Sequence, residues 1–514
     1  MTFHSILFKR TEDIFKKEAP EPGAPDYFVN LNLNQIIDSL TTGKEEYNLK
    51  PFFYTPLSDI DAIVYRQEIM QDLENAVLYE KILLFADRMR TIRKQLTRAL
   101  KLYFKYHKER WFLEIVCIYL TAAEQLLHDL FSEDIKSHGM LLFREYLMNY
   151  VQSDRFKSLV IETNKIITGL SSIQYCVRFR DLRVQVQNFR SETNYSEEIE
   201  GTFTKFEHDQ VKDYRVNYSS DPMDMNHVEA QILDGVAHLY PDIFSQLDTF
   251  FEENQDYLDE TIAKFDREIQ FYIAYLDYID ILRKGDLKFC YPRLTKEEKE
   301  IYDYEGFDLA LAYKLISEKS HIVVNDFYIK EIERIIVVSG PNQGGKTTFA
   351  RTFGQLHYLS CLGCPVPGSK AQLFLFDRLF THFEKEENIK NLRGKLQDDL
   401  VRIHNILDQA TSDSIIVMNE VFTSTALQDQ VFLSRNIMES IIELDLLCVW
   451  VTFIDELASC SNKTVSMIST VFPDNPSLRT FKIIRGPADG LAYAMSIAEK
   501  YSLSYDCLKE RLKL

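Results

Sequence analysis

The sequence predicts a multi-domain protein of the α + α/β class, in which a helical region with a small β-containing insertion precedes an α/β domain. Three observations support this prediction. Helical periodicity dominates residues 30–170 and returns over about 225–284. Apolar and polar residues alternate over 173–186, and short β-branched runs separated by helical stretches follow Gly285. Alternation indicates a strand with one buried face, and strands that alternate with helices are typical of a parallel sheet.

Composition narrows the class of protein before any motif is considered. The 514 residues are 46% hydrophobic and 27% charged, which is ordinary globular usage. Because the chain has neither an apolar run of about 18 residues nor the apolar segment of a signal peptide, we expect a cytoplasmic protein without membrane contact. The 59 basic and 78 acidic residues give a formal net charge of −19. Any nucleic-acid contact must therefore come from a local basic patch.

Cysteine usage gives no disulfide framework, because eight cysteines are few for a chain of this length. Cys361 and Cys364 form a CxxC without a second CxxC or a pair of histidines. Reduced, packed thiols are the simplest interpretation, and a redox or zinc role is the alternative.

The pattern divides the chain into a lead-in, a helical core, a β-containing insertion, returning helices and the α/β domain. Their predicted limits are 1–29, 30–172, 173–224, 225–290 and 291–514. In the core, apolar residues at spacings of three and four predict a coiled-coil-like seam on one long helix. The residues of this seam are Ile82, Phe85, Met89, Ile92, Leu96, Ala99 and Tyr103. In the insertion, the alternation around Arg180 predicts a β-hairpin.

The first β-branched run of the α/β domain leads into a phosphate-binding pattern. Residues 335–338 precede Gly340-Pro341-Asn342-Gln343-Gly344-Gly345-Lys346-Thr347-Thr348, and helical sequence follows. This matches G-x-x-x-x-G-K-S/T between a strand and a helix. Backbone N–H groups of such a loop surround the phosphates of ATP, Lys346 neutralises β- and γ-phosphate oxygens, and the Thr347 hydroxyl ligates Mg²⁺. The alternative is a glycine turn with a solvated lysine.

A second buried run, 415–418, ends in Asn419-Glu420. A carboxylate at this place can polarise the water that attacks the γ-phosphate, so Glu420 and Lys346 are the candidate catalytic residues. Asn419 is the second candidate metal residue beside Thr347, because its amide can hydrogen-bond a metal-bound water. It contributes no negative charge. The alternative for Glu420 is a cap on the segment that follows it.

These residues resemble the ATPase region of the MutS family, whose loop reads G-P-N-M-G-G-K-S-T. Several neighbouring segments are similar to the family's: Asn325-Asp326, Cys364-Pro365-Val366-Pro367, Phe376-Asp377-Arg378-Leu379-Phe380-Thr381, His404-Asn405-Ile406-Leu407, Gly490-Leu491-Ala492-Tyr493-Ala494 and, more loosely, 31–34 and 51–57. The resemblance is strong over 322–500. It implies a helical lever, a clamp-like insertion and an ABC-type ATPase. It also implies that each nucleotide binds between the P-loop of one subunit and the signature segment of another, in a homodimer or in a heterodimer with a paralogue.

Three positions depart from the pattern of the family. Asn419 replaces the metal-side Asp, Gly394 replaces the expected serine of the signature S-G-R-S-T aligned with 391–395, and Phe453 replaces the His of T-H-Y. We therefore expect slow or altered hydrolysis, with a non-hydrolysing ATP-binding scaffold as an alternative. About 30 residues precede the core, without an F-x-E wedge, so we expect no mismatch-recognition or connector domain. We also expect no appended nuclease domain.

The densest basic run predicts where DNA could bind. The candidate residues are Arg88, Arg90, Arg93, Lys94, Arg98, Lys101 and Lys105, and Lys108 and Arg110 follow them. Interleaved aromatic residues (Tyr103, Phe104 and Tyr106) could stack on unpaired bases, whereas a solvated outer face is the alternative. Residues 191–260 contain 18 acidic residues against three basic ones, which would repel DNA. That segment could dock a basic protein or could be solvated.

Together these observations predict an ATPase that acts as a dimer and binds non-standard or branched DNA. An ATP-dependent protein-partner switch with no direct role in DNA binding is the alternative.

Overall fold

The computed structural model describes residues 3–10, 24–180, 183–190, 223–384, 394–473, 475–488 and three single residues near the C-terminus. The chain divides into two compact units. The first contains residues 1–3, 75–135 and 140–266, and the second contains 4–74, 136–139 and 267–514. Within the described ranges, no helix combines the length and the apolar character needed to cross a membrane. The five domain limits given above stay predictions.

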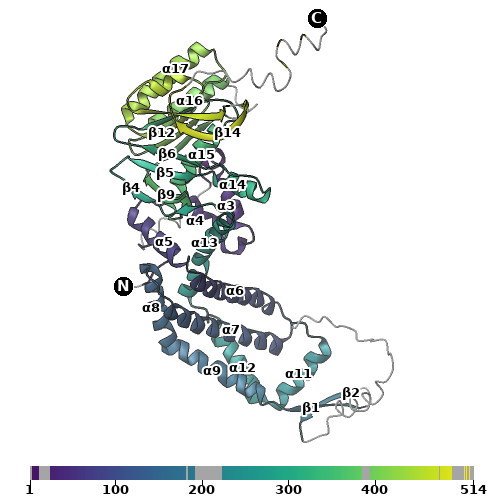
Figure 1. Cartoon of the computed structure of the whole chain (residues 1–514). Coiled ribbons are helices and arrows are strands. Elements are labelled where there is room, and N and C mark those ends of the chain that lie inside the picture. The colour runs from purple at the N-terminus through teal and green to yellow at the C-terminus, as the bar shows by residue number, and fades with distance from the viewer. Residues whose placement is uncertain are drawn as a thin grey trace. The chain divides into compact units, whose positions relative to one another are not determined.

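The first unit is built mainly of long helices (Figure 1). Their bounds are α6 (Ala76–Ala99), α7 (Lys105–Ser132), α8 (His138–Gln152), α9 (Asp154–Ser171), α11 (His227–Leu239), α12 (Pro241–Glu253) and α13 (Glu260–Arg283), of which α8 and α13 continue into the second unit. α6 packs along α7, and α12 packs on α7 and α9. The Asn75 side chain begins α6 by accepting hydrogen bonds from the first free backbone N–H groups of the helix. These helices confirm the predicted helical stretches.

The apolar seam of α6 agrees with the prediction except at its end. Ile82, Phe85, Met89, Ile92 and Ala99 are buried. The inclusion of Tyr103 is wrong, because α6 ends at Ala99 and Tyr103 is 92% exposed. The N–H groups of residues 101 and 102 bond to carbonyls three residues earlier, at 3.0 and 3.1 Å. These bonds close a tight turn that interrupts the helical period.

A β-hairpin interrupts the helices of the first unit, as the alternation predicted. β1 (Tyr175–Arg180) pairs antiparallel with β2 (Arg183–Asn188). α11 packs on β2 (Figure 1), and a Cβ atom added to Gly235 would lie 3.0 Å from the Val186 side chain. Glycine therefore allows the helix to approach the strand closely. Residues 191–222 of the predicted insertion lie outside the described residues.

In its described residues, the second unit combines helices of 3 to 18 residues with three sheets. Its helices are α2 (Tyr27–Asn30), α3 (Leu33–Thr41), η1 (Glu45–Tyr47), α4 (Lys50–Tyr54), α5 (Ile60–Asp72), α14 (Leu309–Ser317), α15 (Lys346–Cys361), α16 (Lys395–Gln409), α17 (Leu427–Leu444) and η3 (Asp455–Ser459). Its strands are β3 (Phe289–Cys290), β4 (Arg293–Thr295), β5 (Ile301–Gly306), β6 (Asn325–Ile329), β7 (Ile335–Ser339), β8 (Val366–Pro367), β9 (Lys370–Phe374), β10 (Leu379–Phe383), β11 (Ile415–Asn419), β12 (Leu447–Val451), β13 (Thr464–Phe472) and β14 (Asn475–Arg485). The strand orders are β10-β11-β12-β7-β13-β14, β4-β9-β5-β6 and β3-β8.

The largest sheet has the parallel character that the sequence predicts. β10, β11, β12, β7 and β13 run parallel, and only β14 is antiparallel to its neighbour. The two runs located in the sequence, 335–338 and 415–418, are β7 and β11, and β12 lies between them in the sheet. The chain thus has the mixed helical and α/β character that was predicted. Because these strands are parallel, their carboxyl ends reach the same edge of the sheet, where α/β proteins commonly bind ligands.

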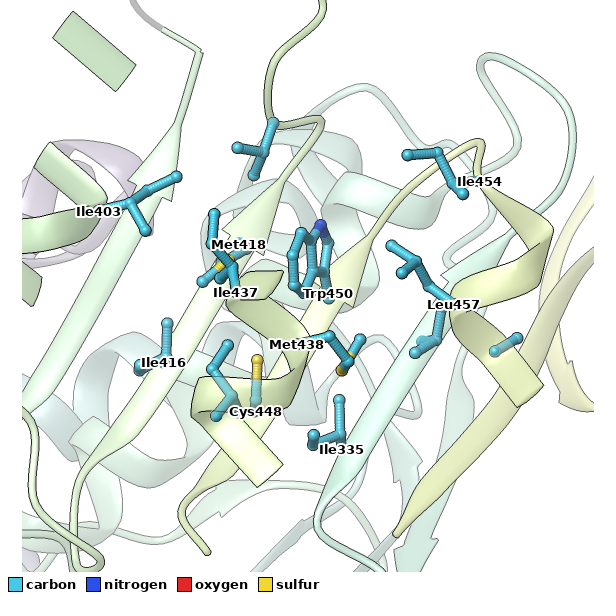
Figure 2. Close-up of a cluster of buried hydrophobic side chains, with 14 of the residues drawn as sticks. Ile335, Ile403, Ile416, Met418, Ile437, Met438, Cys448, Trp450, Ile454 and Leu457 are labelled. Atoms are coloured by element: carbon cyan, nitrogen blue, oxygen red, sulfur yellow. The ribbon is translucent and has the colours of Figure 1, made fainter. Parts of the chain in front are cut away.

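One face of this sheet forms an apolar core with α16, α17 and η3. Figure 2 shows Trp450 beside Met418 of the neighbouring strand, with Met438 of α17 and Leu457 of η3 close by. Trp450 is 1% exposed. α15 packs against β11 and β12. Strands covered in this way read as continuous apolar runs, which explains why their sequences lack alternation.

A buried histidine in α15 makes stability depend on pH. His357 is fully buried, and burial lowers its pKa from 6.5 to about 4. The unfolded chain takes up a proton below pH 6.5, whereas the folded chain stays neutral at this site until about pH 4, so acid favours unfolding. We expect this group to lower the free energy of unfolding by roughly 2 kcal/mol between about pH 7 and pH 5.

Urea unfolding of wild type and His357→Gln at both pH values measures this contribution. The variant should lose about that much of the pH dependence, even if it is less stable at both values. The exposed His404→Gln is the matched control. An unchanged pH dependence in His357→Gln would contradict the assignment.

Candidate functional site

The predicted phosphate-binding residues, 340–348, form the loop after one strand and the first turn of the helix that follows it. β7 ends at Ser339, and α15 begins at Lys346. Gly340 and Gly345 have φ of 116° and 92°, which strongly favour glycine. A Cβ atom added to Gly344 would lie 2.1 Å from Ser469 Oγ, and this hydroxyl donates to the Gly344 carbonyl at 2.7 Å. The glycines therefore let the loop lie directly against β13. The loop leads into the amino end of a 16-residue helix, where free backbone N–H groups favour an anion.

Lys346 lies buried beneath this loop. Its Nζ donates to the carbonyls of Gly340 and Pro341 at 2.9 and 3.0 Å. It also lies 4.3 Å from the ring centroid of Phe453, which follows β12. Burial lowers the pKa of Lys346 to about 8, with Arg479 acting in the same direction and Glu420 against it. The ammonium group therefore faces an aromatic ring where the resemblance would have placed an imidazole.

The two candidate metal residues meet directly. Thr347 Oγ1 donates to Asn419 Oδ1 at 2.9 Å, which joins the first turn of α15 to the end of β11. Both groups carry neutral oxygens of the kind that Mg²⁺ accepts, and Mg²⁺ usually keeps several waters and phosphate oxygens. In the described part of the chain, no group of three or more His, Cys, Asp or Glu side chains could hold a metal. Thr347 and Asn419 therefore fit an ion that is held mainly by phosphate and water.

Glu420 follows β11 in a strained conformation. Its φ is 51°, and its N–H donates to the Val451 carbonyl at 2.9 Å. Such a conformation costs about 1–3 kcal/mol in a residue other than glycine and is frequent at functional sites. Burial raises the pKa of the carboxyl group, with Lys346 acting against this shift and Glu384 adding to it. Glu420 and Lys346 thus lie close enough to interact electrostatically.

A second carboxylate at this edge, Glu384, was missed by the sequence analysis. Phe383 of β10 pairs with Asn419 of β11, so the next residues, Glu384 and Glu420, lie at the same level. Glu384 accepts a hydrogen bond from Thr423 Oγ1 at 3.3 Å and forms an ion pair with Lys395. The order of the strands decides this proximity, and no motif in the sequence signals that order.

The segment aligned with the family signature is only partly described. Residues 391–393 lie outside the described residues, whereas Gly394 and Lys395 begin α16. A Cβ atom added to Gly394 would meet no atom within 4 Å. This position therefore has room for the serine side chain that the family carries.

Other predicted positions have structural partners. Asn325 accepts from the N–H of Ile483 at 2.8 Å and donates to the carbonyl of Phe481 at 3.2 Å, which joins β6 to β14. Cys361 and Cys364 are buried, and burial raises the pKa of both thiols, which favours packed, protonated cysteines. The segment 490–494 lies outside the described residues.

The candidate DNA-binding residues differ in exposure along α6 and the turn after it. Arg88 is half-buried, Arg93 forms an ion pair with Asp266, and Lys105 forms one with Asp248. The remaining four are exposed at helical spacing: Arg90, Lys94 and Arg98 on α6, and Lys101 in the turn after it. We call these four residues the α6 stripe. They belong to the first unit, whereas the loop, Thr347, Asn419 and Glu420 belong to the second.

Comparison with known proteins gives one matching family and several relatives. The family described as MutS domain V matches residues 336–509. The DNA mismatch repair protein MSH3 of Yarrowia lipolytica is 29% identical over 202 residues, which are 38% of this chain and 20% of that protein. The DNA mismatch repair protein MutS of Orientia tsutsugamushi is 26% identical over 220 residues, 42% of this chain and 24% of that protein. The endonuclease MutS2 of Thermus thermophilus is 29% identical over 190 residues, 36% of this chain and 25% of that protein. The matches thus span about a quarter or less of these relatives.

Proposed function

Because this chain is a member of the MutS family, we propose that it binds ATP with Mg²⁺ and hydrolyses the γ-phosphate. The observation that supports this most strongly is the edge of the parallel sheet. There the glycine loop follows β7, and Asn419 and Glu420 lie at the end of β11, with β12 between the two strands; the Thr347–Asn419 hydrogen bond joins the two sides. A phosphate-binding loop, oxygen ligands for a metal and a general base are the parts that phosphoryl transfer to water requires.

In the proposed mechanism each side chain has one task. The backbone N–H groups of residues 340 and 342–348 and the Lys346 ammonium bind the β- and γ-phosphates, whereas Pro341 has no N–H to donate. Thr347 and Asn419 would hold Mg²⁺, Thr347 through its hydroxyl oxygen and Asn419 through its side-chain amide. This ion, when bound, neutralises phosphate charge. Glu420 accepts a hydrogen bond from the attacking water and takes up its proton.

Phosphate release under single-turnover conditions with excess protein tests the proposed hydrolysis. Release that depends on both ATP and Mg²⁺ supports it. A chain that binds ATP tightly and releases no phosphate would instead be an ATP-binding scaffold. Asn419, Gly394 and Phe453 are the residues that favour this outcome.

We further propose that the chain acts as a dimer through its ATPase domain, with itself or with a paralogue, and binds branched or otherwise non-standard DNA in the cytoplasm. The names of the relatives support the connection with DNA, and the α6 stripe supplies the positive charge. Sedimentation with and without saturating ATP tests the dimer. A strictly monomeric chain at saturating ATP, alone and with a paralogue, would contradict it.

The α6 stripe gives a specific expectation for DNA binding. Replacing Lys94 and Lys101 together with Glu should lower affinity for fork DNA at least about tenfold at ~0.1 M salt. It should also reduce the slope of log affinity against log salt by about two, because each lysine that neutralises a phosphate contributes about 0.9. Fluorescence anisotropy over a salt series measures both quantities.

Lys157→Glu combined with Lys165→Glu is the matched control for this experiment, since both lysines are exposed on α9 and the change in charge is the same. An equal loss of affinity in the control would show that only the net charge matters.

A protein-partner switch is the second candidate function, and the acidic segment favours it. Residues 191–260 carry 18 acidic side chains against three basic ones, which suits a basic protein. Binding of fork or junction DNA that weakens with salt supports the first candidate. Absence of DNA binding at low salt, together with ATP-dependent capture of a basic protein, would support the second.

A further inference from the structure

One aromatic side chain beside the α6 stripe stands out by its exposure. Tyr103 is 92% exposed, more than any other large apolar or aromatic residue in the described part of the chain. It lies in the turn between α6 and α7, two residues after Lys101. A tyrosine ring usually buries much of its surface, so such an exposed ring is a candidate contact for a ligand.

The other aromatic residues of this basic run are engaged within the unit. Tyr106 packs edge-to-face on Phe244 of α12, with ring centroids 4.9 Å apart. Phe104 is partly buried and lies against Tyr103, with centroids 5.4 Å apart and planes at 87°. Phe104 thus supports the Tyr103 ring at its side, while most of the surface of that ring stays open to solvent. Among these three aromatics, Tyr103 is the one available for stacking.

In the sequence on either side of Tyr103, the charged residues are basic. Residues 88–108 contain no Asp or Glu. On α6, Arg90, Lys94 and Arg98 follow one another at intervals of four residues, so they extend over about 12 Å of one helix face. That length corresponds to three or four nucleotides at about 3.4 Å each. Asp87 lies one turn before Arg90 and marks the acidic end of this row.

We propose that Tyr103 and the α6 stripe form a binding site for an unpaired DNA strand, in which the cations contact successive phosphates and a base stacks on the tyrosine ring. This proposal rests on the proposed DNA binding and names the part of the DNA that is recognised. Inside a continuous duplex each base is covered by its neighbours, so a base offers its face to an aromatic side chain where it is unpaired, and such stacking tolerates any sequence. A continuous duplex would occupy the cations and leave Tyr103 without a partner.

The experiment compares the full-length wild type with Tyr103→Ala and Tyr103→Phe in anisotropy titrations. The labelled probes are a single-stranded oligothymidine, a blunt duplex of the same length and a fork with single-stranded arms. Stacking on an aromatic ring contributes about 1–3 kcal/mol per base, so Tyr103→Ala should bind the single strand about 5- to 150-fold more weakly. Its affinity for the duplex should stay within about twofold of wild type, and Tyr103→Phe should bind all three probes like wild type.

Tyr175→Ala is the matched control, because Tyr175 is an exposed tyrosine of the same unit that lies on β1, outside the basic run. Equal binding of the single strand by wild type and Tyr103→Ala would overturn the proposal, as would an equal loss in Tyr175→Ala. At least tenfold tighter binding of the matching single-stranded RNA would overturn the assignment to DNA. If Tyr103→Ala binds every probe like wild type while the Lys94/Lys101 double substitution abolishes binding, the proposed DNA function is supported and the proposed stacking site is refuted. If wild type binds none of the probes, both fail.

Discussion

Replacing Lys346 with Ala is expected to reduce the affinity for ATP at least about a hundredfold. The ammonium group lies at the centre of the glycine loop, where two loop carbonyls and the Phe453 ring surround it. Hydrogen bonds to charged groups contribute about 1.5–3 kcal/mol each. Without Lys346, the bound phosphates lose at least one such hydrogen bond and the electrostatic attraction of the ammonium group. Titration with a fluorescent ATP analogue in the presence of Mg²⁺ measures the loss.

Lys370→Ala, which removes an exposed lysine of the same unit, is the control for this experiment and should bind like wild type. Lys346→Met keeps most of the side-chain volume and should behave like Lys346→Ala. Unaltered affinity in both Lys346 variants would contradict the assignment of the loop. Urea unfolding of the variants separates this result from a loss of folding. Removal of a desolvated ammonium group should not lower stability much.

Replacing Glu420 with Gln is expected to lower the rate of phosphate release at least about a hundredfold while ATP affinity changes by less than about threefold. A general base contributes about 10²- to 10⁴-fold, and glutamine keeps the size of the side chain but cannot take up the proton. Glu420 is half-buried, and this burial is the main cause of the raised pKa of its carboxyl group. Single-turnover release of phosphate, combined with an independent ATP titration, separates the chemical step from binding.

Glu456→Gln, in the exposed ion pair with Arg435, is the matched control and should release phosphate like wild type. Glu384→Gln is the more informative comparison, because Glu384 lies at the level of Glu420 across β10 and β11. A smaller loss in Glu384→Gln than in Glu420→Gln fits a supporting role through Thr423 and Lys395. A Glu420→Gln chain that hydrolyses ATP at the wild-type rate would refute the assignment of the base.

Much of the fold could be predicted because the relevant patterns are local. The strands β7, β11 and β12 are short apolar runs bounded by polar residues, and parallel strands covered on both faces have such sequences. The hairpin of β1 and β2 shows the alternation of half-exposed strands. The end of the α6 seam was predicted wrongly, because apolar spacing continues through the turn in which the helix hydrogen bonds stop. Spacing reports which residues could share a face, whereas the backbone decides where the helix ends.

The candidate site divides in the same way. The glycine loop and its lysine are contiguous in sequence, since a phosphate must be surrounded by consecutive N–H groups, and a motif can therefore identify them. Glu384 and Phe453 reach the same edge from other strands. Their proximity follows from the strand order β10-β11-β12-β7, to which no local pattern corresponds.

The sequence by itself determined the class of the fold, the phosphate-binding loop and the resemblance to the MutS family, because each depends on neighbouring residues. Only the tertiary structure decided which of the basic residues are engaged with carboxylates, as Arg93 is with Asp266, and which aromatic ring is left in solvent. It also decided that Thr347 meets Asn419, 72 residues further along the chain. Charge and exposure depend on what packs against a side chain, and packing joins residues that are distant in sequence.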